Sequence, residues 1–157
     1  MLKINRKIST YISLVLTVLF FIGLVFMIFY MPTFVKYLIG LPDNTGERAH
    51  LTEIDNFLIH AGAYSILLLA FAGDSMLFAL LLLVIKGRVF TGASVALIRG
   101  ISWCLMLIGL VFTVLVKYFT LSIFVGFVFF FLGISIRVVK NVIEQAVHIK
   151  EENDFTI

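Results

Sequence analysis

Charged side chains are scarce in this 157-residue chain. They make up 13% of the sequence, about half their share in a soluble domain, while hydrophobic residues reach 62%. A water-soluble fold this apolar would have too little polar surface left to cover its core. The composition therefore indicates a membrane protein and argues against the ordinary soluble classes.

Cysteine is nearly absent, and the motifs of common enzymes are missing. Cys104 is the only cysteine, which excludes an internal disulfide and a cysteine-based zinc site, and we interpret it as a small apolar filler. His50, His60 and His148 share no spacing that would place two of them on one helix face, so a metal site lacks support. No GxSxG, Walker, HExxH or dinucleotide-binding pattern occurs. We expect no enzymatic activity, no cofactor and no metal.

What the chain does contain is long apolar runs. There are four of them: Tyr11–Ile39, Phe57–Ile85, Ala93–Val116 and Phe119–Ile136. A helix needs roughly 20 mostly apolar residues to cross a hydrocarbon core of about 30 Å, and each run is near that length or longer. The runs predict one integral membrane domain that spans the lipid bilayer four times.

The predicted fold is an all-α membrane protein, an antiparallel up-down bundle over residues 1–157 whose fourth helix extends into the cytoplasm. The expected helices lie at about 10–39, 53–86, 93–117 and 119–150, and a tail follows at 151–157. Pro32 should kink or break the first helix, because it removes a backbone donor. Thr52 with Asp55 matches a capping box at the start of the second helix, and Thr91 or Ser94 can cap the third.

The distribution of basic residues predicts the orientation. One side of the membrane carries most of them: Lys3, Arg6, Lys7, Lys86, Arg88, Arg99, Arg137, Lys140 and Lys150. The other side has Lys36, Arg48 and Lys117 together with an acidic loop. Because cytoplasmic loops are enriched in lysine and arginine, both termini should be cytoplasmic. We interpret the first run as a retained signal anchor, since no small-residue cleavage site follows it.

Asp74 is the most unusual residue, because it lies in the middle of the second run. A carboxylate at that depth costs several kcal/mol, of the order of 3, unless it is paired, protonated or hydrated. Arg99 lies in the third run at a height that differs by about 6 Å at helical rise. We predict a buried Asp74–Arg99 pair, assisted by Ser75 or Ser102. The alternative is that Asp74 caps a break at Gly73 and faces water; a proton relay is disfavoured, because no second acidic residue lies at similar depth.

The fourth helix should continue beyond the membrane as an amphipathic segment. Its apolar stripe consists of Val139, Val142, Ile143, Ala146 and Val147, and polar residues occupy the other face. The segment is charge-balanced, so it suits packing on protein better than binding to anionic lipid. That protein is either the chain's own cytoplasmic loops, a partner or a second copy. Gly126 and Gly133 favour close helix packing, within the chain by default, and leave a homo-oligomer open.

The end of the chain resembles a known bacterial membrane family. The stretch Ile149-Lys-Glu-Glu-Asn-Asp-Phe-Thr-Ile157 is similar to the closing Glu-Asn-Asp-Leu-Thr-Ile/Val signature of domain-of-unknown-function family 2975, with Phe155 in place of the usual leucine. The segments Lys86–Phe90 and Leu97–Trp103 and the Met31-Pro32 exit from the first helix fit the same family. Asp74 matches none of its motifs.

The resemblance implies a four-helix protein of the bacterial cytoplasmic membrane, often encoded beside a small helix-turn-helix regulator. It suggests a non-enzymatic regulatory or sensory partner of that regulator, with no direct contact to nucleic acid. The interaction tail would be Glu151, Glu152, Asn153, Asp154, Phe155, Thr156 and Ile157. The alternative is that these residues form a solvated, frayed end with no partner. The alternative function is a small transport or immunity-type protein that acts on an envelope ligand and would need Asp74, Arg99 and a water path.

Overall fold

The computed structural model describes residues 6–40 and 52–154, and all regular structure within them is helical. The elements in chain order are α1 (Arg6–Ile39), α2 (Glu53–Ile85), α3 (Gly92–Val114), the short 3-10 helix η1 (Leu115–Lys117) and α4 (Ser122–Asp154). The four α-helices are each long and apolar enough to cross a membrane, judged by length and composition. The predicted all-α class and the multi-pass membrane character are confirmed at this level.

The helix bounds differ from the prediction at the two ends of the chain and between α3 and α4. The first helix begins at Arg6, earlier than expected, and α4 begins at Ser122 because η1 and a turn occupy the residues before it. The last helix continues to Asp154, so it includes the first part of the predicted tail. The rest of that tail, Phe155 to Ile157, and residues 41–51 between the first two helices lie outside the described residues.

Both predicted helix caps are present. The Thr52 hydroxyl accepts a hydrogen bond from the Asp55 backbone N–H, and the Asp55 carboxylate accepts one from the Thr52 N–H, which completes the capping box. Thr91 is the N-cap of α3 and accepts from the Ser94 N–H. These caps fix where α2 and α3 begin, because they satisfy backbone donors that the first turn of a helix leaves unpaired.

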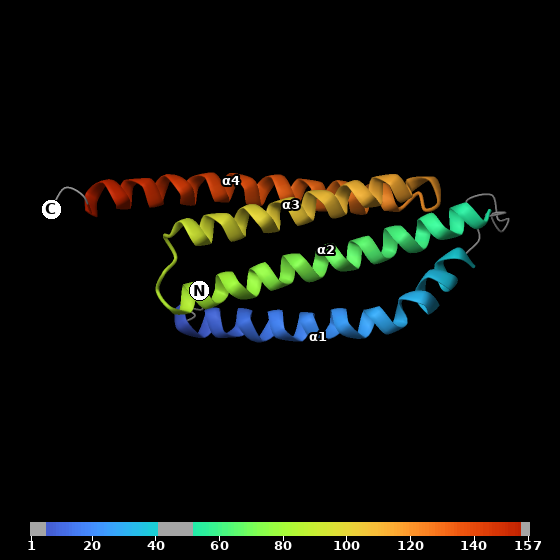
Figure 1. Ribbon diagram of the computed structural model, residues 1–157, viewed down its shortest axis with the longest axis horizontal. Coiled ribbons are helices and arrows are strands. Elements are labelled where there is room, and N and C mark those ends of the chain that lie inside the picture. Colours follow the sequence, from blue (N-terminus) through green and yellow to red (C-terminus); the bar gives the residue numbers. More distant parts are fainter. Residues whose placement is uncertain (1–5, 41–51, 155–157) are drawn as a thin grey trace, which may run out of the picture.

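The helices pack in a row, in the order of the sequence (Figure 1). Among the described residues, broad helix–helix contacts join only α1 to α2, α2 to α3 and α3 to α4. A closed bundle would also bring α1 against α4, so the row is open. Short connections explain the neighbours: a turn of six residues (86–91) separates α2 from α3, and η1 with a few residues leads from α3 into α4.

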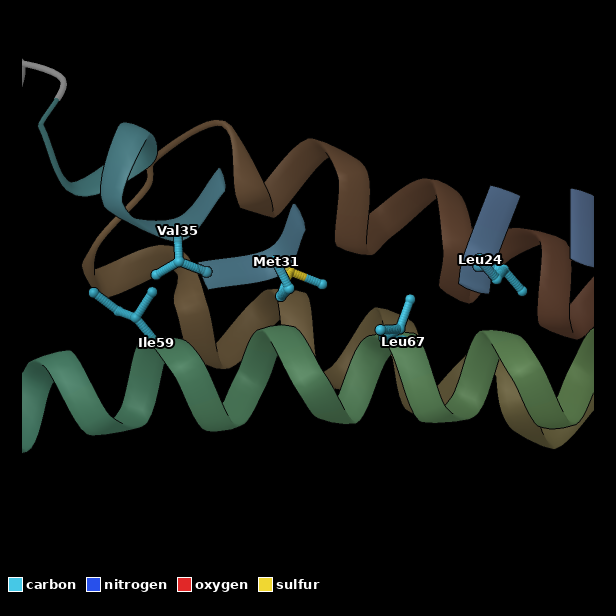
Figure 2. Close-up of a cluster of buried hydrophobic side chains, with 5 residues drawn as sticks. All are labelled: Leu24, Met31, Val35, Ile59 and Leu67. Atoms are coloured by element: carbon cyan, nitrogen blue, oxygen red, sulfur yellow. The ribbon is translucent and has the colours of Figure 1, made fainter. Parts of the chain in front are cut away.

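The α1–α2 contact is a narrow seam of buried side chains. Thr17, Leu24 and Met31 recur every seven residues on α1, a spacing that keeps one face of a helix turned toward its neighbour. On α2 the buried residues are Ile59 and Leu67, with Asp74 further along the same stripe. Figure 2 shows the apolar part of this seam, where Val35 of α1 lies beside Ile59.

Of the two outcomes predicted for Pro32, a kink or a break, α1 shows a bend and no break (Figure 1). The helix continues through Pro32 to Ile39, and its last turns bend toward α2 (Figure 1). Because proline lacks a backbone donor, it allows such a bend without ending the helix. The bend seats Val35 in the seam, where it is fully buried.

The backbones of α3 and α4 approach each other closely. A Cβ atom on Gly109 would lie 2.8 Å from the Gly126 carbonyl oxygen, and a Cβ on Gly126 would lie 2.9 Å from the Gly109 carbonyl oxygen. Gly133 meets α3 in the same way, at Met106 and Ser102. The glycines that the sequence analysis assigned to helix packing therefore let these two backbones approach each other within the chain.

Candidate functional site

Asp74 is buried in the α1–α2 seam. Its exposed fraction is 6%, and its Oδ2 atom has no hydrogen-bond partner. The side chain borders a cavity of about 350 Å³ between the two helices, which Thr17 and Phe21 of α1 also line. The second helix runs unbroken past Gly73, so the alternative that Asp74 caps a break and faces water is wrong.

The predicted pairing of Asp74 with Arg99 is not formed. Their heights agree with the prediction, since Gly73 contacts Cys104 and Gly100 contacts Met76 across α2 and α3. Asp74, however, is the residue after Gly73, and Arg99 is the residue before Gly100. One residue turns a helix by about 100°, which places Asp74 on the α1 side of α2 and leaves the Arg99 side chain exposed.

Arg99 instead joins α3 to α4. Its guanidinium donates a hydrogen bond to Glu144 Oε1 at 3.2 Å, and Lys140 donates to the other oxygen of the same carboxylate. Lys140 and Glu144 have the i, i+4 spacing of a helical ion pair, which the sequence alone indicates. The contact between Glu144 and Arg99 could not be predicted from the sequence, because it depends on how α3 and α4 are rotated about their axes.

Neither serine that was expected to assist Asp74 does so. The Ser75 hydroxyl donates to the Phe71 carbonyl within α2. The Ser102 hydroxyl is buried and donates to the Gly133 carbonyl at 2.9 Å, so it faces α4. The structure adds a residue that the sequence analysis missed: Thr17, buried at 6% exposure on the opposite wall of the same cavity.

The amphipathic segment of α4 is only partly covered. Val147 is buried and Ile143 is partly buried, whereas Val139 and Val142 are exposed at 52% and 61%. The predicted apolar stripe is therefore divided between a part that packs against the chain itself and a part that is open.

The beginning of the predicted interaction tail extends this helix. Glu151, Glu152 and Asn153 are exposed on its last turns, and Asp154 is its final residue. Phe155, Thr156 and Ile157 lie outside the described residues.

At the opposite end of the row, Asp55 ties α2 to the α3–α4 connection. Its Oδ1 atom accepts hydrogen bonds from Lys117 Nζ at 3.0 Å and from the Tyr118 hydroxyl at 2.7 Å. The bond to the carboxylate raises the pKa of Tyr118, because the shared proton becomes harder to remove. Sequence reasoning identified Asp55 as a capping residue and missed this second role.

Two further observations concern groups singled out in the sequence. Trp103 of α3 lies under the guanidinium of Arg137 on α4, 4.9 Å from ring centroid to Cζ, and so forms a cation–π contact between the helices. Within the described part of the chain, no three histidine, cysteine, aspartate or glutamate residues gather as a metal site would require.

The comparisons with known proteins add nothing to this geometry. No family model matches the chain, and neither the curated proteins nor the solved structures include a match. The resemblance to domain-of-unknown-function family 2975 stays a prediction.

Proposed function

We propose that this chain is a four-span protein of the bacterial cytoplasmic membrane that presents the end of α4 to a cytoplasmic regulator. In this proposal the helices cross the bilayer alternately up and down, both termini are cytoplasmic, and the protein has no enzymatic activity. The regulator belongs to the helix-turn-helix class that the family resemblance implies.

The charges at the two ends of the row support this orientation. The start of α1, the end of α2, the start of α3 and the end of α4 lie at one end (Figure 1). The lysines and arginines of the helices and turns are more numerous at that end, with Arg6, Lys7, Lys86, Arg88 and Lys150, than at the other, with Lys36 and Lys117. Under the positive-inside rule the basic end is cytoplasmic.

The observation that carries the proposal is the length of α4. The Arg99–Glu144 contact places Glu144 level with the first turns of α3. The helix then continues to Asp154 and extends past the start of α3 (Figure 1). The ten residues that follow Glu144 make about 15 Å of helix at 1.5 Å per residue, and the last of them form the projecting part.

The chemistry of the projecting part suits a basic, partly apolar partner surface. Glu151 and Glu152 are exposed on it, and the apolar side chain of Ile149 is 60% exposed. Acidic residues beside exposed apolar ones can meet the basic surface of a DNA-binding protein and an apolar groove at its edge. The Arg99–Glu144–Lys140 contacts hold the helix in position just before it projects.

A co-purification experiment tests this proposal. The tagged, detergent-solubilised protein is mixed with the purified helix-turn-helix regulator encoded beside it, with and without residues Glu151–Ile157. We expect the full chain to retain the regulator and the truncated chain to lose it, while the control Glu53→Gln, at the other end of the row, retains it. Failure of any cytoplasmic protein to bind in a tail-dependent way contradicts the proposal.

The alternative, a transport or immunity-type protein, is favoured by the cavity beside Asp74. It was expected to use Asp74 and Arg99 together. Arg99 donates a hydrogen bond to Glu144 instead. The alternative function therefore lacks one of the two residues on which it depends and ranks second.

A further inference from the structure

The cavity between α1 and α2 presents polar groups of one kind. Asp74 is 94% buried, by difference from its 6% exposure, and its Oδ2 atom has no partner. The two hydroxyls that line the same cavity have already used their protons: Thr17 donates to the Ser13 carbonyl and Ser75 to the Phe71 carbonyl, at 2.9 and 2.8 Å. With Asp74 ionised, these three residues offer only lone pairs, so among the described lining residues the side chains provide acceptors and no free donor.

A cavity of this kind selects for a cation. No basic residue lines it among the residues that the structure describes, and a carboxylate buried among apolar helices is costly without a counter-charge. A bare metal ion would need several oxygen ligands in a close shell. Only one carboxylate is present here, and most of the wall is apolar.

The apolar part of the wall specifies the kind of cation. Phe21 and Phe78 line the cavity together with Val18 and Ile22. Aromatic rings attract cations through their faces, and aliphatic side chains favour an apolar body. The volume of about 350 Å³ lies at the small end of the range for sites that enclose small organic molecules, roughly 300–1,000 Å³.

The route into the cavity also favours a ligand that is soluble in lipid. Val18, Ile22 and Phe78 border the cavity and are themselves exposed on the outside of the row. In a membrane this surface faces hydrocarbon, so a molecule would reach Asp74 from the side, through the bilayer.

We propose that the α1–α2 cavity binds a small lipophilic organic cation, whose positive group pairs with the Asp74 carboxylate and whose apolar body lies against Phe21 and Phe78. The cavity exists whether or not α4 binds a regulator, so this site and the proposed function stand or fall separately.

The test uses two probes of nearly the same shape. Benzyltrimethylammonium carries a positive charge, and neopentylbenzene replaces its nitrogen by carbon and is neutral. Binding of each to the detergent-solubilised full chain is measured by calorimetry or by ligand-observed NMR. Asp74→Asn removes the charge at nearly constant volume, and Asp55→Asn is the matched control at a carboxylate outside the cavity.

We expect the wild type and Asp55→Asn to bind the cation equally, and Asp74→Asn to bind it at least about 30-fold more weakly, the lower end of the scale for removing one partner of a buried charge pair. Binding of the neutral probe should be the same in all three proteins. Val18→Phe, which fills the cavity without touching the carboxylate, should weaken both probes. Absence of cation binding to the wild type, equal binding to Asp74→Asn, or unchanged binding to Val18→Phe would each overturn the proposal.

Discussion

Arg99 of α3 donates a hydrogen bond to Glu144 of α4 at 3.2 Å, so the arginine inside the third apolar run binds a carboxylate that follows the fourth. Asp74, at a similar height on α2, is left facing α1 without a partner. One contact therefore anchors the base of the projecting α4 segment, and it leaves a buried acidic residue in the seam between the first two helices.

Charge reversal should distinguish the observed pair from the pair predicted from sequence. Arg99→Glu or Glu144→Arg alone should reduce the free energy of unfolding by up to about 1 kcal/mol. The loss is small because both side chains are partly exposed. The melting temperature in detergent reports it. The two together should recover part of the loss; recovery is incomplete because Lys140 lies beside position 144. Recovery by the combination Asp74→Arg with Arg99→Asp would contradict the observed arrangement.

Methyl groups at the α3–α4 crossing should be poorly tolerated. Gly109→Ala or Gly126→Ala places a Cβ within 3.0 Å of the partner's backbone oxygen, which has no flexible side chain to move aside. We expect each to destabilise the protein by about 1–3 kcal/mol, the usual range for overpacking. Thermal unfolding of the purified protein measures this.

Gly23→Ala is the matched control for the crossing, because nothing lies within 4 Å of the Cβ it adds. It should leave stability unchanged or raise it slightly, since alanine favours helix over glycine by about 1 kcal/mol. Equal effects of all three substitutions would mean that α3 and α4 do not approach as closely as described.

Tyr118→Phe should loosen the end of the row where α2 begins. It removes the 2.7 Å hydrogen bond to Asp55 while it keeps the ring, at a cost of about 1 kcal/mol. Faster amide hydrogen exchange in the first turn of α2 is the measurement, and Tyr37→Phe, at a tyrosine that is 68% exposed, is the control. Identical exchange in the two variants would show that the bond contributes nothing.

Two valines in the α4 segment should separate docking from folding. Val142 is 61% exposed, so Val142→Gln should leave the melting temperature unchanged and weaken capture of the regulator. Val147 is buried, and Val147→Gln should lower the free energy of unfolding by about 2 kcal/mol or more, because it buries an amide without a compensating hydrogen bond. If Val142→Gln captures the regulator as well as the wild type, the open part of the stripe is not a docking surface.

Hydropathy and local signals predicted the existence and type of every long helix, because the membrane dictates the length and composition of a span. The Thr52–Asp55 and Thr91 caps were also readable, since each depends on residues three positions apart. The ends of α1 and α4 were less predictable, because polar residues continue a helix without any change that marks the boundary.

The rotation of each helix could not be predicted from the sequence. Nearly every face of α2 and α3 is apolar, so no pattern distinguishes the side that packs from the side that meets lipid. The estimated heights of Asp74 and Arg99 were sound, and the prediction failed because one residue of offset from Gly73 and from Gly100 turned each side chain away from the other. Thr17 was missed for the same reason, since its burial depends on which face of α1 meets α2.

We propose that the end of α4 lies in the cytoplasm, and the accessibility of engineered cysteines tests this placement. Cys104→Ala removes the single native thiol. New cysteines then replace Ile149 on the projecting segment or Ile54 at the start of α2, both exposed positions. In intact cells a membrane-impermeant maleimide should label Ile54→Cys and should label Ile149→Cys only after permeabilisation. Labelling of Ile149→Cys in intact cells would contradict the claim.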